Sequence, residues 1–358
     1  MASPAWSAWL SSRLSRLKET NLLRTLLPVD PLPSHPHSLL LPSSPLLPTP
    51  TTAASPAPVV VFAANDYLGL SCDLEVRQAA CEAAAAHGCG PRASPLVCGH
   101  TSAHRALETE LAALKGSEEA ALFPSGFSAN LAVLGAFGSS PDVAIFSDAW
   151  NHASIVDGAR LAARGGAELH VYRHSDLSHL NTLLSSCAKP RKLVISDSLF
   201  SMDGDFADCI GLSALCRTHQ ALLCLDEAHA TLVCGDRGGG VAEAQGVEGG
   251  VDISVGTLSK AFGAHGGFVC CSSEMKQVLT STGRSGIFST ALPMPIVAAA
   301  RAALRLATPE RRARLWSNLD TFKLATGVQV QSPIVPLIIG SEQMALEASA
   351  ELLRRGLF

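Results

Sequence analysis

Short apolar runs alternate with longer amphipathic segments through the middle of the chain. The runs predict buried strands, and they lie at Ala120–Phe123, Val143–Phe146, Leu169–Tyr172, Leu193–Ser196, Leu222–Leu225, Ile253–Val255 and Gly267–Cys270. Helix-length segments separate most of the early runs, at Ser128–Ala136, His152–Ala163 and Leu177–Cys187. Because strands that alternate with helices form a mostly parallel sheet covered on both faces, the pattern predicts an α/β fold. Ligands bind such sheets at the carboxyl ends of strands, where Asp197 and Asp226 stand.

The N-terminal region precedes this pattern. From Met1 to Leu27, apolar residues such as Trp6, Leu10 and Leu14 recur at helical spacing. This spacing favours an amphipathic helix, with an organellar transit peptide as the alternative. The stretch Pro28–Pro58 is rich in Pro and Ser, so we expect an extended insertion without helix or sheet.

The last part of the chain predicts a smaller unit. A helix is expected at Ile296–Leu306, an apolar strand at Ile334–Ile339 and a helix at Glu342–Arg355. The expected parts of the chain are therefore an N-terminal helix (1–27), the insertion (28–58), a large domain (59–295) and an incomplete small C-terminal α+β domain (296–358).

Composition and charge narrow the class of protein. Of the 358 residues, 47% are hydrophobic and 16% are charged, which describes a globular core. A net charge of −4 disfavours nucleic acid and anionic membranes as partners, and no apolar run approaches the length that spans a bilayer. The 11 cysteines include no C-x-x-C pair, so we expect reduced thiols in a compartment such as the cytosol, and neither disulfides nor a zinc site.

One lysine is distinguished by its surroundings. Lys260 ends the sequence Gly256-Thr257-Leu258-Ser259-Lys260, among small uncharged neighbours. In a buried segment, desolvation lowers the pKa of a lysine, as a Schiff-base lysine requires. Upstream, Asp226 ends an apolar run, and an aspartate is the usual partner of the ring nitrogen of pyridoxal phosphate (PLP). For Lys260 alone, a side chain that merely extends from a loop into solvent is the alternative.

Other candidate residues surround these two positions. Ser125-Gly126-Phe127 follows a strand and opens a helix, and N–H groups at a helix N-terminus bind phosphate. Hydroxyl and imidazole groups complete the set, at Thr257, Thr290, Ser201, His152 and His229. The structural alternatives are a core position for Phe127, turn and cap positions for the hydroxyls, and helix-start or core positions for the histidines.

The ordered motifs along the chain resemble those of the α-oxoamine synthases. They are Asn65-Asp66-Tyr67-Leu68-Gly69-Leu70, Gly126-Phe127, Phe200-Ser201-Met202-Asp203-Gly204, Asp226-x-x-His229 and Gly256-Thr257-Leu258-Ser259-Lys260. The resemblance runs from about Leu10 to the last residue. It implies the aspartate-aminotransferase-like fold (PLP fold type I), PLP as cofactor, a homodimer and no metal. Pro91–Gly99 and Leu23-Arg24 point to the branch that joins alanine to a pimeloyl thioester in biotin synthesis.

The resemblance also implies a role for each matched residue. Lys260 would hold PLP and later move the Cα proton of alanine, and Asp226 would keep the ring nitrogen protonated. His152 would stack on the ring, while Ser201 and His229 would contact its phenolic oxygen. The phosphate end of the cofactor would be bound by Gly126, Phe127, Thr257 and a partner subunit's Thr290. The substrate would be bound by Arg24, Asn65 and His152.

The resemblance also predicts an incomplete C-terminal part. Members of the family continue past the equivalent of Phe358 with an arginine that binds the amino-acid carboxylate. We therefore expect a truncated form that keeps the cofactor-binding half of the active site but lacks this part of the substrate-binding half. The alternatives are another α-oxoamine synthase that uses glycine or serine, and a non-catalytic truncated homologue. A peroxisomal location is the alternative to the cytosol.

Asp226-Glu227-Ala228-His229 also spells the DEAH signature of nucleic-acid helicases. Such helicases need a G-x-x-x-x-G-K-[ST] phosphate loop upstream, and the sequence has none. The acidic net charge disfavours the helicase interpretation as well.

Overall fold

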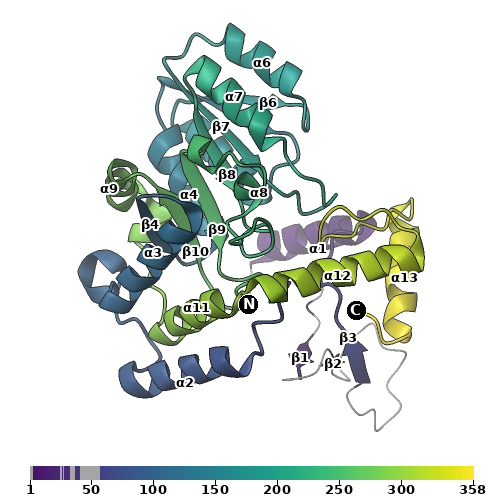
Figure 1. Ribbon diagram of the computed structural model, residues 1–358. Coiled ribbons are helices and arrows are strands. Elements are labelled where there is room, and N and C mark those ends of the chain that lie inside the picture. The colour runs from purple at the N-terminus through teal and green to yellow at the C-terminus, as the bar shows by residue number, and fades with distance from the viewer. Residues whose placement is uncertain (1–2, 25, 27, 33–36, 41–56) are drawn as a thin grey trace. The chain divides into compact units, whose positions relative to one another are not determined.

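The computed structural model describes residues 3–24, 26, 28–32, 37–40 and 57–358, and Figure 1 shows their helices and strands. By the contacts among its residues, the chain divides into two units, Ala64–Ile338 and Met1–Ala63 with Ile339–Phe358. The large domain predicted at 59–295 lies almost entirely in the first unit, and the segment 296–358 is divided between the two.

A seven-stranded sheet forms the centre of the larger unit (Figure 1). Its strands, in spatial order, are β4 (Glu119–Phe123), β10 (Gly267–Cys271), β9 (Ile253–Thr257), β8 (Leu222–Asp226), β7 (Arg191–Asp197), β5 (Val143–Asp148) and β6 (Glu168–Tyr172). All neighbours are parallel except β10, which is antiparallel to both β4 and β9. All seven predicted strands and the α/β class are confirmed.

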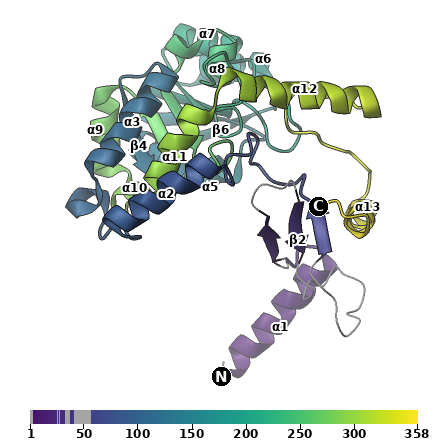
Figure 2. The ribbon, with the colours of Figure 1, turned by 60° about the horizontal axis from the view of Figure 1, so that its bottom comes forward.

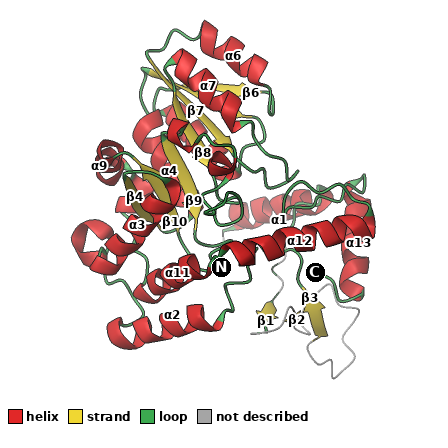
Figure 3. Ribbon diagram, viewed as in Figure 1, coloured by secondary structure: helices red, strands yellow, loops and turns green. Residues whose placement is uncertain are grey.

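Helices cover both faces of this sheet (Figure 3). Successive residues of β7 alternate between two cores, since Val194 belongs to one apolar cluster while Leu193 and Ile195 belong to the other. This burial on both faces explains why the strands appear in the sequence as continuous apolar runs. The first cluster includes residues of α3 (Ser102–Lys115), α6 (Leu177–Ser186), α7 (Cys209–His219) and α11 (Met294–Leu306), and the second those of α4 (Gly126–Val133), α5 (Ala153–Arg164) and α9 (Ser273–Thr282).

The helices predicted in this unit are confirmed as α4, α5, α6 and α11, with α4 continuing into a π-helical turn at Leu134–Gly138. Further helices of this unit were not among the predicted ones: α2 (Leu74–His87), α3, α7, α8 (Val241–Ala244), α9, α10 (Arg284–Ile287) and α12 (Pro309–Thr326). Figure 2 shows α11 packed beside α2 and α3. Among the described residues, no helix has the length and hydropathy to cross a membrane.

The smaller unit contains α1 (Pro4–Glu19), a three-stranded antiparallel sheet and α13 (Glu342–Arg354). The strands β1 (Val29–Pro31), β2 (His37–Leu40) and β3 (Ala57–Val60) lie in that order in the sheet. A small core forms where Val59 and Leu353 pack against Val29, Val61 and Phe358. The helices expected at both ends of the chain are confirmed as α1 and α13. The apolar side chains of α1, such as Trp6 and Leu10, are exposed.

Two expectations about secondary structure are wrong. The segment 28–58 contains parts of three strands, although it was expected to form none. Pro31 and Pro58 lie on the outer strands β1 and β3, where a missing N–H is tolerated, and the middle strand β2 contains no proline. Conversely, Ile334–Ile339 forms no strand, because Pro336 interrupts the apolar run and cannot donate to a ladder of hydrogen bonds.

Candidate active site

The predicted site residues converge at the carboxyl ends of the parallel strands. Asp197, Asp226 and Thr257 are the last residues of β7, β8 and β9. They border a cavity of about 240 Å³ whose lining residues are Ser125, Gly126, Phe127, His152, Ser154, Asp197, Ser201, Asp226, Ala228, His229, Thr257, Ser259 and Lys260. All the predicted site residues except Thr290, Arg24 and Asn65 line this cavity.

Lys260 follows β9 in a tight turn. Its carbonyl accepts a hydrogen bond from the N–H of Gly263 at 2.8 Å. Gly263 has a φ of +61°, and a Cβ there would lie 2.2 Å from the backbone nitrogen of Ser71, so only glycine fits this turn. Burial lowers the pKa of the Lys260 amine, and the negative charges of Asp226 and Asp197 oppose this shift. The lysine therefore has the environment that its sequence context predicts.

Asp226 is held by two hydrogen bonds to its carboxylate. Oδ1 accepts from the N–H of Ala228 at 2.9 Å, and Oδ2 accepts from Asn130 Nδ2 at 2.6 Å. The side chain is buried, with 6% of its surface exposed. A buried carboxylate held in this way is a preorganised acceptor for a cationic N–H group.

Asp197 lies beside Asp226, because the two residues are register partners in neighbouring strands. Its Oδ2 accepts from the backbone N–H of His152 at 3.0 Å. Burial, together with the nearby Asp226 carboxylate, raises the pKa of Asp197 well above its usual range. Asp197 was expected at a strand end but without a role in the site. Its position one strand away from Asp226 was the available signal.

His229 is partly buried and paired with a tyrosine. Tyr67 Oη lies 2.7 Å from His229 Nδ1. Burial lowers the pKa of His229 to about 3, and the nearby Lys260 and His152 add to this shift. Burial also raises the pKa of the Tyr67 phenol. A neutral imidazole therefore meets a protonated phenol near neutral pH, and the motif Asn65–Leu70 contributes Tyr67 to the site.

Hydroxyls and a helix N-terminus meet at one end of the cavity. Ser125 caps α4, since its Oγ accepts from the N–H of Ser128 at 3.1 Å. Thr257 Oγ1 lies 2.8 Å from Ser259 Oγ. A Cβ on Gly126 would stand 3.3 Å from the Cβ of Thr257, so a glycine keeps the helix start close to these hydroxyls. Such a set of N–H and O–H donors suits a phosphate group.

Phe127 and His152 line the cavity, and both are exposed. Their rings meet edge to face, with centroids 6.3 Å apart, and 41% of the Phe127 surface is exposed. Phe127 is therefore part of the cavity wall and not of the core. His152 precedes α5, and Ser201 lies in the turn after β7. Both residues line the cavity from segments that follow strands.

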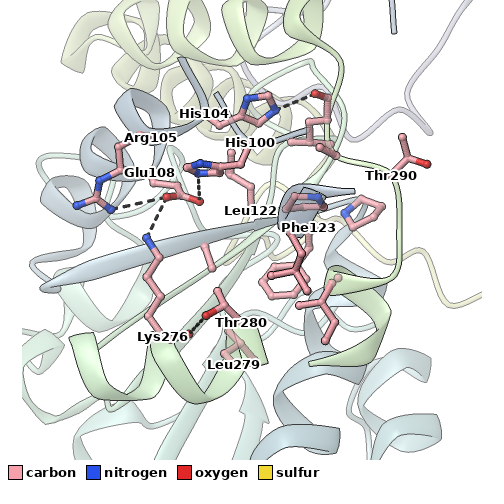
Figure 4. A pocket seen from close by; sticks show the side chains of 18 residues that line it. His100, His104, Arg105, Glu108, Leu122, Phe123, Lys276, Leu279, Thr280 and Thr290 are labelled. Atoms are coloured by element: carbon pink, nitrogen blue, oxygen red, sulfur yellow. Dashed lines mark hydrogen bonds and ion pairs between the residues drawn. The ribbon is translucent and has the colours of Figure 1, made fainter. Parts of the chain in front are cut away.

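Three predicted residues do not line this cavity. Thr290 lines a second cavity, of about 270 Å³, together with residues such as Leu122 and Phe123 (Figure 4). Asn65 is connected to the site through Tyr67, whose Oη lies 3.4 Å from Asn65 Oδ1. Arg24 belongs to the smaller unit and is exposed.

Comparisons with known proteins identify the family. The family of class I and II aminotransferases matches residues 57–357. The 8-amino-7-oxononanoate synthase of Anaeromyxobacter dehalogenans is 42% identical over 358 residues, which cover 98% of this chain and 85% of that protein. The chain belongs to the 8-amino-7-oxononanoate synthase family. The enzyme of that name from Arabidopsis thaliana is 50% identical over 314 residues, which cover 83% of this chain and 66% of the plant protein.

Solved structures share the fold. A serine palmitoyltransferase from S. paucimobilis, with a bound PLP-myriocin aldimine, superposes with a TM-score of 0.84 at 27% identity, covering 100% of this chain and 91% of that chain. An 8-amino-7-oxononanoate synthase from Francisella tularensis gives a TM-score of 0.70 at 27% identity, covering 84% of this chain and 87% of that chain. The predicted aminotransferase-like α/β fold, the resemblance to the α-oxoamine synthases and PLP as the cofactor are confirmed.

Proposed function

We propose that this protein is a PLP-dependent acyltransferase that condenses L-alanine with a pimeloyl thioester. The products would be 8-amino-7-oxononanoate, CO₂ and the free thiol of coenzyme A or a carrier protein, in biotin synthesis. The observation that carries the proposal is that Lys260, Asp226 and His229 meet in one cavity of a chain whose curated relatives are named for this product.

The cavity fits PLP by the chemistry of its two ends. The start of α4 and the hydroxyls of Thr257 and Ser259 would bind the phosphate, and the Asp226 carboxylate would pair with the protonated ring nitrogen. When bound, PLP supplies an electron sink that stabilises negative charge at the Cα of an amino acid. This chemistry serves both loss of a Cα proton and loss of a carboxylate, as decarboxylative condensation requires.

The side chains of this protein would prepare and move the proton. An uncharged Lys260 amine would hold the cofactor and would later accept the Cα proton, and burial favours that uncharged form. His152 would lie against the flat face of the ring. His229, which is neutral, and Ser201 would donate hydrogen bonds to the phenolic oxygen of the cofactor. Phe127 shields this region beside His152.

A substrate panel tests the proposal. The PLP-loaded protein would be given alanine, glycine or serine with pimeloyl-, acetyl-, succinyl- or palmitoyl-CoA, and thiol release would be measured. Alanine with pimeloyl-CoA is expected to be the fastest pair, and K260A is expected to lose both the visible absorbance of the bound cofactor and turnover. Binding of PLP without turnover of any pair would instead support a non-catalytic homologue.

Serine with a long-chain acyl-CoA is the second candidate pair. The observation that favours it is the TM-score of 0.84 to serine palmitoyltransferase, against 0.70 to the Francisella tularensis 8-amino-7-oxononanoate synthase. The sequence identities of 42–50% to curated 8-amino-7-oxononanoate synthases favour alanine. Faster turnover of serine than of alanine would decide for the second pair.

A homodimer and a cytosolic location complete the proposal. Thr290 is exposed and lies outside its own Lys260 cavity, so it is available to a partner subunit. Two exposed apolar side chains suit an interface between subunits: Leu96, which lines the same cavity as Thr290, and Phe288, which is two residues from it. The 11 free cysteines suit a reducing compartment. Light scattering would test the dimer, and a fluorescent fusion would distinguish cytosol from peroxisome.

A further inference from the structure

A chain of hydrogen bonds connects Asp226 to His152 through two buried residues that have no role in the function proposed above. Asn130 Nδ2 donates to Asp226 Oδ2 at 2.6 Å and to Ser154 Oγ at 2.9 Å. Ser154 Oγ in turn lies 2.7 Å from His152 Nδ1. Asn130 and Ser154 are both fully buried. These hydrogen bonds therefore link Asp226, whose carboxylate would pair with the ring nitrogen of PLP, to His152, whose imidazole would lie against the face of that ring.

The direction of each hydrogen bond follows from the groups involved. The Asp226 carboxylate can only accept, so the amide of Asn130 must turn its NH₂ group toward it. Ser154 Oγ accepts from the same NH₂ group, and its own hydrogen is available to donate to His152 Nδ1. The backbone N–H of Ser154 also donates to Nδ1, at 3.2 Å, because His152 caps α5. Nδ1 is therefore an acceptor, and a neutral His152 carries its hydrogen on Nε2.

One unpaired atom shows that this arrangement of hydrogen bonds lowers the stability of the fold. Asn130 Oδ1 is buried and has no hydrogen-bond partner among the described residues. An unpaired buried oxygen destabilises a fold, but turning the amide over would place that oxygen against Asp226 Oδ2. The amide keeps its orientation because its two N–H groups are both used, by Asp226 and by Ser154.

We propose that Ser154 and Asn130 are positioning residues of this active site. They hold His152 as the neutral tautomer with hydrogen on Nε2, and this N–H is free to donate to the carboxylate of the amino-acid substrate. They also couple the orientation of His152 to that of Asp226. The proposal rests on the proposed function, since it assigns these residues to binding of the amino acid.

A double-mutant cycle tests whether Ser154 acts through His152. In the PLP-loaded enzyme, S154A is expected to lower kcat/KM for alanine about 5-fold, the effect of one neutral hydrogen bond. In an H152A background the same substitution is expected to change kcat/KM by less than about 1.5-fold, because no imidazole is left to position. An equal loss in both backgrounds would show that Ser154 supports only the fold, and would overturn the proposal.

Asn130 is tested in the same way, and a matched serine provides the control. N130A and S154A together are expected to lower kcat/KM by less than the product of their separate effects, since each interrupts the same chain of bonds. Multiplicative effects would contradict the coupling. Ser178 is the second residue of α6, as Ser154 is of α5, but it is exposed. S178A is expected to match the wild type.

The tautomer itself can be observed directly. In ¹⁵N-histidine-labelled, PLP-loaded protein, the His152 signals are identified by their loss in H152A. A protonated, pyrrole-type Nε2 and an unprotonated Nδ1 are expected, and the reverse pattern would overturn the proposal. This measurement does not depend on turnover. If no substrate pair reacts, the proposed function fails, while the tautomer still decides whether the chain of hydrogen bonds exists.

Discussion

Lowering the pH is expected to destabilise the cofactor-free protein through His229. Burial lowers the pKa of this histidine to about 3, from 6.5 for a free side chain. Between these two values the unfolded chain binds a proton that the folded protein does not bind. The free energy of unfolding therefore falls as the pH falls through this window, and the contribution of His229 is constant above it.

The size of the effect follows from the two pKa values. Each pH unit inside the window removes about 1.4 kcal/mol of stability. At pH 5, about 1.5 units below the unfolded pKa, the loss is about 2 kcal/mol. It grows toward about 5 kcal/mol near pH 3, where His229 itself begins to bind a proton in the folded state. The cofactor-free protein is the proper sample, because bound PLP would change the charges beside His229.

Denaturant unfolding of wild type and H229Q at about pH 7.5 and pH 5 measures this contribution. Other titrating groups affect both proteins, so they cancel in the comparison. H229Q is expected to lose about 2 kcal/mol less than the wild type between the two pH values. H87Q, which removes an exposed histidine at the end of α2, is expected to follow the wild type. Equal losses in wild type and H229Q would refute the lowered pKa of His229 and its neutral state in the folded protein.

Other predictions concern the groups around the cavity. Y67F removes the hydroxyl 2.7 Å from His229 and is expected to weaken PLP binding about 5-fold in an absorbance titration; unchanged affinity would argue against the pair. G263A places a Cβ against Ser71 and is expected to lower the melting temperature more than G327A, which has a similar φ of +71° but no neighbour within 4 Å. Equal shifts would show that the close approach does not matter. K260A chains are expected to be inactive and T290A chains to have reduced activity, and mixing them should raise activity above that of T290A alone through heterodimers with one intact site. No recovery would contradict a shared site.

The sheet could be predicted from the sequence because its strands are buried on both faces. Leu193, Val194 and Ile195 face alternate cores and are all apolar, so β7 is visible as a continuous run. Asp226 and Thr257 could then be placed in the site, because ligands bind such sheets at the carboxyl ends of parallel strands. Lys260 could be recognised from its small, uncharged neighbours, which matched the burial that lowers its pKa.

The rest of the site depends on contacts between distant residues. Tyr67 meets His229 across 162 positions, and Asn130 meets Asp226 across 96, so neither pair has a local pattern. The strands β1 to β3 were missed because prolines mark their edges, and only pairing in space shows that β2 lies between them. By contrast, α12 could have been predicted from the sequence, because Thr308 and Pro309 are typical of a helix start and Gly327 is typical of a helix end.

The fate of the carbon atoms of alanine tests the proposed condensation directly. The PLP-loaded protein would be incubated with pimeloyl-CoA and L-alanine labelled with ¹³C either at the methyl or at the carboxyl carbon, and the products analysed by mass spectrometry. The expected product is 8-amino-7-oxononanoate that keeps the methyl label, with the carboxyl label released as CO₂, and K260A is expected to form no product. A loaded enzyme that forms no product, or a product that keeps the carboxyl label, would contradict it.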